Sequence, residues 1–385
     1  MAPFSDLNTT WFALIGLLWA GYLFLEGFDF GVAVVAPFVA SDETDRRICL
    51  NAIGPVWDGN EVWLLTAGGA TFAAFPLWYA RLFNGFYLAL FLVLLALIVR
   101  GVSFEFRGKH DSSAWRRGWD WANFVGSLVP ALVWGVAFTN LAHGVPLSPD
   151  GHYMAGLPGL LHPIAILGGL ASLALFSLHG LVFLSLKTAG ELAARARRWA
   201  VPTGMAAAAL LAGTVAWVAA AGRPSSPGSL GAALPLALGT ASVLAAGLAP
   251  VLVVRGYAAG AFISTGFSVL AGLGAVFSRM FPAVLPASNR AASSLSIAAA
   301  ASQHYTLVVM TVVAACFTPF VLAYQAWTYW VFRQRLDRPP EGVTAPAGGG
   351  PTRGGPARGG PAGGAMAGGA MAGGVGPGPA APERA

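Results

Sequence analysis

The chain has 385 residues, of which 56% are hydrophobic and only 10% are charged. Soluble domains average about 25% charged residues, so these proportions exclude an ordinary soluble enzyme, a disordered regulator and a coiled coil. The formal net charge of +6 does not point to nucleic acid, because the basic residues sit at the ends of apolar segments, where membrane topology explains them. Repeated apolar runs of bilayer-spanning length instead predict an all-α protein that crosses a membrane many times.

The hydropathy pattern predicts nine transmembrane helices. In chain order they cover residues 10–40, 59–79, 82–100, 120–142, 160–186, 199–221, 230–254, 258–281 and 303–332. The second is the weakest of the nine, because polar residues crowd its start. Residues 1–338 are therefore expected to form one transmembrane domain. In residues 339–385, 36 of 47 residues are Gly, Pro or Ala, a composition that predicts a disordered tail.

The Lys and Arg residues divide unequally between the two sides of these spans. Eighteen of the 22 fall in the connections after odd-numbered spans and in the C-terminal segment, with Arg100 and Arg107 among them. The other side holds Arg81, Arg223, Arg279 and Arg290. Because loops rich in Lys and Arg stay in the cytoplasm, the N-terminus is predicted to lie outside and the C-terminus inside.

Two acidic residues, Glu26 and Asp29, lie within the first predicted span. Their spacing of three residues places both on one face of a helix. Ionisable residues inside a membrane are costly and are usually functional. We therefore predict that this pair holds and passes protons. The alternative is a structural pair that an arginine or backbone donors neutralise.

A second acidic pair, Asp58 and Glu61, begins the second predicted span with the same spacing. Asp58 is predicted either to relay protons or to cap the helix, since a side-chain oxygen at this position can accept from free backbone N–H groups. Trp57 and Trp63 flank the pair and are candidate membrane-interface anchors.

Two further acids follow on the predicted inner side. Glu105 comes after the third span, and Asp120 opens the fourth. Acids from several segments at one membrane face predict the mouth of a proton-uptake path. Its expected members are Glu26, Asp29, Asp58 and Glu105, with Glu61 and Asp120 either in the path or structural.

Histidine and cysteine give no sign of a metal or redox centre. His179 alone lies deep in a span, and we expect it to be a hydrogen-bonded packing residue rather than a haem ligand. Since no second intramembrane histidine faces it, this chain is expected to ligate no haem and no metal. Cys49 and Cys316 are far apart in the sequence and are each expected to be a small buried hydrophobic residue.

Two classes of protein fit these residues: a proton-coupled transporter and an accessory subunit of a respiratory complex. A transporter favours broken helices in two related halves around a polar site at the membrane midplane. No internal repeat is evident in this sequence, and the later spans are nearly free of charge. Both features favour the subunit.

A set of motifs, in order along residues 10–335, sharpens this prediction. They are Glu26–Gly31, Gly54–Trp63, Thr66–Ala70, Arg100–Arg107, Trp119-Asp120, Gly135–Asn140, Gly144–Pro146, Tyr305–Leu307 and Tyr324–Trp330. Each fragment is weak alone, but the ordered set closely resembles subunit II of the cytochrome bd-type quinol oxidases.

The resemblance implies two four-helix bundles plus one peripheral helix. It also implies membership of an aerobic terminal oxidase in the bacterial cell membrane, which oxidises quinol, reduces O2 to water and builds a proton gradient. The b-type haems, the expected haem d and the quinol would belong to subunit I, the partner in a heterodimer. Subunit II would hold no haem ligand, line the proton route, and be able to bind a structural quinone or lipid. A small accessory subunit can complete such complexes.

Residue roles follow from position in these motifs. Glu26, Asp29, Asp58 and Glu105 match the acidic positions of the family's proton route, with Glu at 26 and 105 where relatives use Asp. Trp63 matches an aromatic residue beside an oxygen path, and packing is its alternative role. The sequence leaves the choice between ubiquinol and menaquinol open.

Overall fold

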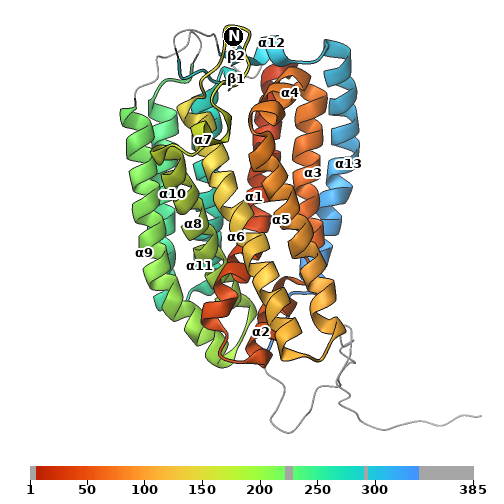
Figure 1. The fold of residues 1–385 in the computed structure, drawn as a ribbon, viewed down its shortest axis with the longest axis vertical. Helices are drawn as coiled ribbons and strands as arrows, with labels where there is room; N and C mark the ends of the chain where they lie inside the picture. The colour runs from red at the N-terminus through yellow and green to blue at the C-terminus, as the bar shows by residue number, and fades with distance from the viewer. Residues whose placement is uncertain (1–5, 222–228, 290–293, 338–385) are drawn as a thin grey trace, which may run out of the picture. The chain divides into compact units, whose positions relative to one another are not determined.

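The computed structural model describes residues 6–221, 229–289 and 294–337, and the structural statements below concern these ranges. Long helices run side by side and alternate in direction along the chain (Figure 1). They are α1 (Leu7–Val39), α3 (Trp57–Ala74), α5 (Tyr87–Phe106), α6 (Ser113–His143), α8 (Pro163–Lys187), α9 (Gly190–Ala220), α10 (Ala233–Val254), α11 (Ala258–Met280) and α13 (His304–Val331).

Short elements cover the two ends of these helices. At the lower end in Figure 1 lie α2 (Glu43–Ile53) and η1 (Arg107–Lys109). The opposite end carries α4 (Pro76–Gly85), α7 (Gly156–Leu160), the antiparallel strands β1 (Ala283–Leu285) and β2 (Leu295–Ser296), and α12 (Ile297–Ala300). We refer to these as the α2 end and the α12 end.

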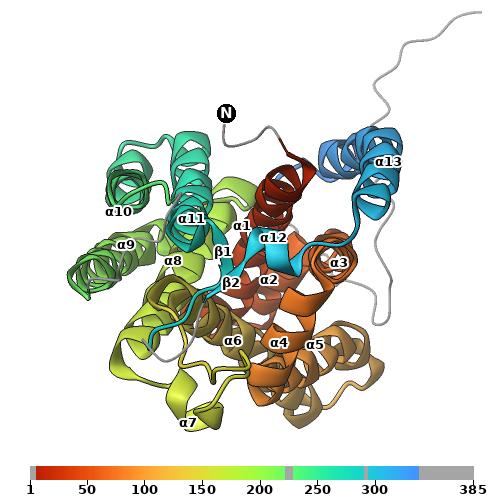
Figure 2. The same ribbon diagram turned by 90° about the horizontal axis from the view of Figure 1, so that it is seen from above.

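The long helices form two groups of four and one outlier. Helices α1, α3, α5 and α6 pack together, and α8, α9, α10 and α11 form the second group. Contacts of α1 and α6 with α8 join the groups, whereas α13 packs mainly on α1 and α3 of the first group and lies beside α3 (Figure 2). Leu307 is the one buried residue of α13. The expected arrangement of two four-helix bundles plus a peripheral helix is confirmed for the described residues.

Eight of these helices are long and apolar enough to cross a membrane, and α3 is not among them. The second predicted span, residues 59–79, is interrupted at Phe75, which separates α3 from α4. Pro76 explains the break, because proline disfavours helical geometry at the preceding residue, and Phe75 has φ −136° and ψ 68°. Since α3 still runs alongside its neighbours between the two ends, the expected alternation of direction holds (Figure 1).

Helix α1 is central because it contacts α3, α6, α8 and α11. At its crossing with α8 the backbones approach so closely that a Cβ on Gly31 would overlap the carbonyl oxygen of Phe176. A Cβ on Gly180 would likewise overlap the backbone of Gly31. These glycines therefore set the distance at which the two bundles meet.

Two sequence expectations about single residues are wrong. Arg100, counted among the loop cations, lies inside α5 and is completely buried, because α5 continues to Phe106. Cys316 is exposed on α13, whereas Cys49 on α2 is buried as expected. Burial and the nearby Asp45 carboxylate raise the pKa of the Cys49 thiol to about 12. Arg223, Arg290 and the tail at 339–385 lie outside the described residues.

Candidate functional site

The first feature of the site is a fully buried ion pair between α1 and α5. Arg100 Nη1 lies 2.8 Å from Glu26 Oε2, and neither side chain is exposed to solvent. The guanidinium also lies over the Phe30 ring, with its Cζ 4.9 Å from the ring centroid. A charge in such apolar surroundings needs a partner, since removing either member leaves the other without compensation. Sequence reasoning raised an arginine partner only as the structural alternative for this acidic pair.

A third charged group joins the pair from α3. Glu61 Oε2 lies 3.6 Å from the same Arg100 Nη1, and the Glu61 side chain is 22% exposed. Two carboxylates thus share one guanidinium. Because the carboxylates outnumber the cation here, the cluster can bind an additional proton. A matched ion pair lacks this capacity.

Asp29 is also completely buried, but it pairs with a neutral residue. Asn60 Nδ2 donates to Asp29 Oδ2 at 2.6 Å, which links α1 to α3. Asn60 Oδ1 in turn accepts from Gln325 Nε2 at 2.9 Å and from Tyr329 Oη at 2.8 Å. Asp29 is therefore connected through one amide to two polar side chains of the peripheral helix α13.

The other predicted acids lie apart from this buried cluster. Asp58 and Glu105 are exposed in the chain, and within the described residues neither forms a hydrogen bond or ion pair. The helix containing Asp58 has Val56 at its N-cap position and no side-chain capping bond, so the capping alternative is wrong. Asp58 remains one helical turn from Glu61 on α3.

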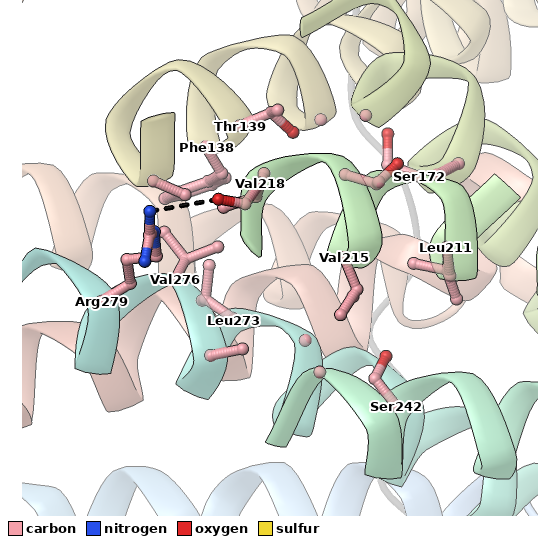
Figure 3. Close-up of a pocket in the computed structure, with 18 of the residues that line it drawn as sticks. Phe138, Thr139, Ser172, Leu211, Val215, Val218, Ser242, Leu273, Val276 and Arg279 are labelled. Carbon is pink, nitrogen blue, oxygen red and sulfur yellow. Dashed lines mark hydrogen bonds between the residues drawn. The ribbon is translucent and has the colours of Figure 1, made fainter. Parts of the chain in front are cut away.

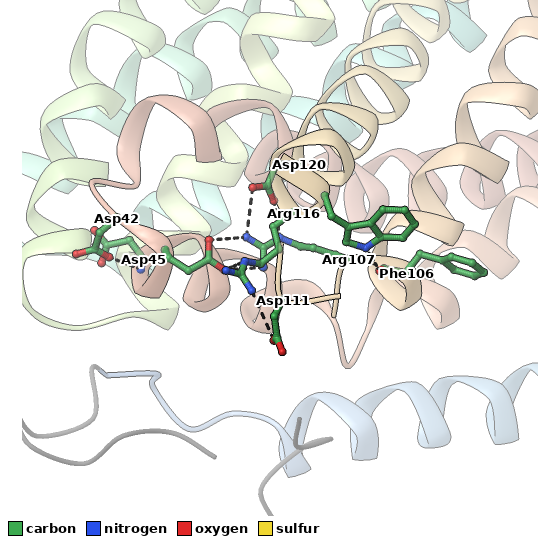
Figure 4. A network of polar contacts seen from close by, with 9 residues as sticks. Asp42, Asp45, Phe106, Arg107, Asp111, Arg116 and Asp120 are labelled. Carbon is green, nitrogen blue, oxygen red and sulfur yellow. Dashed lines mark hydrogen bonds and ion pairs between the residues drawn. The ribbon is translucent and has the colours of Figure 1, made fainter. Parts of the chain in front are cut away.

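Asp120 belongs to a separate network at the α2 end (Figure 4). Arg107 Nε lies 2.6 Å from Asp120 Oδ1, and Arg107 Nη1 lies 2.9 Å from Glu43 Oε1. Arg116 extends the network to Glu43 at 3.7 Å. Nearby, Asp45 pairs with Arg195 of α9. These contacts join α2 to η1, α6 and α9, and they hold Asp120 at the α2 end of the helices.

The aromatic residues near the site pack inside the chain. Trp57 stacks on Phe104, with centroids 4.9 Å apart, and the Arg100 guanidinium lies 5.9 Å from the Trp57 ring. Trp63 is half-buried and packs against α1, where a Cβ on Gly21 would lie 2.6 Å from its ring. Trp57 is therefore a wall of the buried cluster rather than a simple interface anchor, and the oxygen-path role of Trp63 stays a prediction.

His179 uses both ring nitrogens within the second bundle. Nδ1 lies 2.7 Å from Thr265 Oγ1, and Nε2 lies 3.2 Å from the carbonyl oxygen of Phe24. The ring stacks on Phe262 with centroids 4.6 Å apart. This is the geometry of a hydrogen-bonded packing residue. No group of three or more His, Cys, Asp or Glu suited to a metal ion occurs in the described parts of the chain.

An apolar cavity of about 210 Å³ lies between α6 and the second bundle (Figure 3). Its walls include Phe138, Leu211 and Leu273, and its few polar groups include Ser172. At one side Arg279 Nη2 donates to the carbonyl oxygen of Val218 at 3.1 Å. Such a space accepts an apolar chain, and Arg279 is a cation in its lining.

The polar residues that complete the site were not predicted from the sequence. Arg100 carried a signal, because the apolar pattern continues past it to Phe106, which places it within a helix. No local pattern marked Asn60, Gln325 or Tyr329 beyond their place in the motifs. Their contact could not be predicted from neighbouring residues, since residues 60 and 329 are separated by 269 positions in the chain.

The fold and the site define the class of this protein: a multi-pass, all-α membrane protein that pairs charged residues in its interior. Comparison with known proteins then identifies the family. The model of the family described as cytochrome bd terminal oxidase subunit II matches residues 7–332. The chain belongs to this family, and it is a member of a quinol oxidase complex that includes subunit I.

Individual relatives agree. Cytochrome bd ubiquinol oxidase subunit 2 of Bacillus subtilis (strain 168) is 40% identical, over 86% of this chain and 97% of the relative. Cytochrome bd-I ubiquinol oxidase subunit 2 of Escherichia coli (strain K12) is 36% identical, over 88% of this chain and 97% of that relative. A chain in the structure of bd oxidase from Geobacillus thermodenitrificans has a similar fold, with a TM-score of 0.61 at 10% identity over 85% of this chain and 97% of that one. Membership decides for the respiratory subunit over the transporter, and it is consistent with the bacterial plasma membrane.

Proposed function

We propose that this chain supports quinol-driven O2 reduction by leading protons from the cytoplasm toward haems held by subunit I. The observation that carries the proposal is the buried cluster of Glu26, Glu61 and Arg100, with Asp29 one turn of α1 away. O2 reduction to water consumes one proton for each electron, so a route for protons into an apolar interior is required. Uptake from the cytoplasm then builds the proton gradient.

The route begins at Asp58, which is exposed and lies at the α2 end, the end we assign to the cytoplasm from the Lys and Arg distribution. Glu61 lies one turn further along α3 and is partly exposed. Glu61 and Glu26 share Arg100 Nη1, so a proton released by one carboxyl can reach the other without leaving the field of the guanidinium. Glu105 lies on the same end and supplies a second exposed carboxyl.

Haem ligation is assigned to subunit I, which would carry the b-type haems, haem d and the quinol site. Support comes from His179, since both of its ring nitrogens already have partners at 2.7 and 3.2 Å. A haem iron would have to displace one of them. This chain's part in the heterodimer is therefore scaffolding and proton supply.

The apolar cavity between α6 and the second bundle is proposed to hold the chain of a structural quinone or lipid. Its walls are apolar, and Thr139, Ser172 and Ser242 are spaced polar points around them. Extraction of the purified complex followed by mass spectrometry should recover such a molecule in constant ratio to protein. A Leu273→Trp variant, which fills the space, should lose it.

The proton route is tested with Asp58→Asn in the complete complex. This change removes the titratable group but keeps the size of the side chain. We expect normal assembly and haem content with strongly reduced quinol-driven oxygen consumption, and partial recovery in Asp58→Glu. Asp150→Asn, which alters an exposed acid in the connection between α6 and α7, is the matched control and should turn over normally. Normal turnover of Asp58→Asn would show that the route does not begin there.

A further inference from the structure

The contact between α5 and α6 contains several buried polar atoms that have no protein partner. On α6, both amide atoms of Asn123 and the hydroxyl of Ser127 are buried without a hydrogen bond in the described part of the chain. On α5 the same holds for Nε and Nη2 of Arg100, and on α1 for Oε1 of Glu26. Buried polar groups in native proteins are nearly always hydrogen-bonded, to protein or to ordered water, so this set calls for an explanation.

Helical spacing and one close approach between helices connect these residues. Asp120, Asn123 and Ser127 are spaced by three and four residues, which places them on one face of α6. That face meets α5 beside Arg100, since a Cβ on the intervening Gly126 would lie 2.8 Å from Arg100 Cβ. At the α2 end this face of α6 includes Asp120, whose side chain is 20% exposed and bonded to Arg107. Polar groups therefore extend from the surface to the buried Glu26–Arg100 pair.

We propose that a short file of internal water molecules fills this contact, positioned by Asn123 and Ser127, and that it forms a second cytoplasmic proton inlet from Asp120 to Glu26. An amide donates and accepts, and a hydroxyl does both, so Asn123 and Ser127 can each orient water in either direction. Internal water typically makes about three hydrogen bonds to buried groups that otherwise lack partners. Arg100 and Glu26 supply the remaining donors and acceptor at the inner end.

The transfer conserves atoms and charge. A proton taken up at the Asp120 carboxylate is passed to the first water, each water forms one O–H bond as it gives up another, and the last water protonates Glu26. Arg107 and Arg100 keep their protons throughout, and Asn123 and Ser127 position water without being titrated. The inference rests on the proposed role of Glu26 but adds an access route distinct from Asp58.

Substitutions at Asn123 separate hydration from packing. Asn123→Ala leaves space that water can occupy, whereas Asn123→Leu fills the space with an apolar group. A water file predicts a larger loss of quinol-driven oxygen consumption for Asn123→Leu than for Asn123→Ala, with a several-fold loss for Asn123→Leu at high pH, where protons are scarce. A packing role predicts the reverse order, because alanine leaves the larger void.

Ser127→Ala removes a single oxygen atom and serves if the leucine variant does not assemble. We expect it to slow turnover at high pH, whereas Ser185→Ala, which removes a buried hydroxyl of α8 bonded to the Val182 carbonyl, should not. A density map of the purified complex that resolves water should show it beside Asn123 and Arg100. Normal turnover of Asn123→Leu or Ser127→Ala at every pH would overturn the inlet, and with Asp58→Asn slowed it would leave the proposed function intact.

Discussion

Replacement of Arg100 by methionine tests the buried cluster most directly. The guanidinium is the one cation within hydrogen-bonding or ion-pair distance of Glu26 among the described residues, and both side chains are fully buried. Arg100→Met keeps the length of the side chain and leaves the Glu26 carboxylate without a charged partner. Breaking a buried ion pair from one side costs about 3–5 kcal/mol.

That cost should appear as a lower thermal unfolding midpoint of the purified complex, on the order of 4–6 °C for a chain of this size. Arg117→Met is the matched control, because Arg117 is an exposed residue of α6, and it should leave the midpoint unchanged. Intrinsic tryptophan fluorescence of the complex in detergent gives the measurement.

The double variant Glu26→Gln/Arg100→Met separates stability from activity. Neutralising both partners removes the unpaired charge, so most of the lost stability should return. Oxygen consumption should stay low, because no titratable group remains at position 26. If the unfolding midpoint of Arg100→Met equals that of the wild type, the Glu26–Arg100 pair contributes nothing measurable to stability. If the double variant consumes oxygen normally, Glu26 is not on the proton route.

Four further predictions follow from the packing and the sequence. Gly31→Ala should block assembly, because its Cβ overlaps the Phe176 carbonyl, whereas Gly118→Ala, with open space around it, should assemble normally on a native gel. His179→Ala should leave every haem band in the absorption spectrum, and loss of one haem from an assembled complex would contradict this. Deletion of residues 339–385 should preserve assembly and oxygen consumption, since the segment lacks apolar content to dock. The raised pKa of Cys49 keeps its thiol neutral, so maleimide should label Cys49 at pH 8 only after unfolding. The contribution of the neutral thiol to the stability of the fold is present below pH 9 and is lost as the pH rises toward 12.

Local sequence alone determined the helices and the family. Apolar runs of spanning length predict helices because backbone groups in a membrane must be satisfied within the segment, and a window of neighbouring residues contains that information. The spacing of Glu26 and Asp29 placed them on one face for the same reason. The break at Phe75 was also readable in principle, since Pro76 acts on its immediate neighbour.

Tertiary structure decided which partners these residues have. Glu26 meets Arg100 from 74 positions away, and Asn60 meets Tyr329 from 269 positions away. It also separated Asp58 and Glu105, exposed at one end, from the buried carboxylates that the sequence grouped with them. Periodicity fixes the face of a helix on which a residue lies, but the helix that this face meets depends on packing distances set by contacts such as Gly31 against α8.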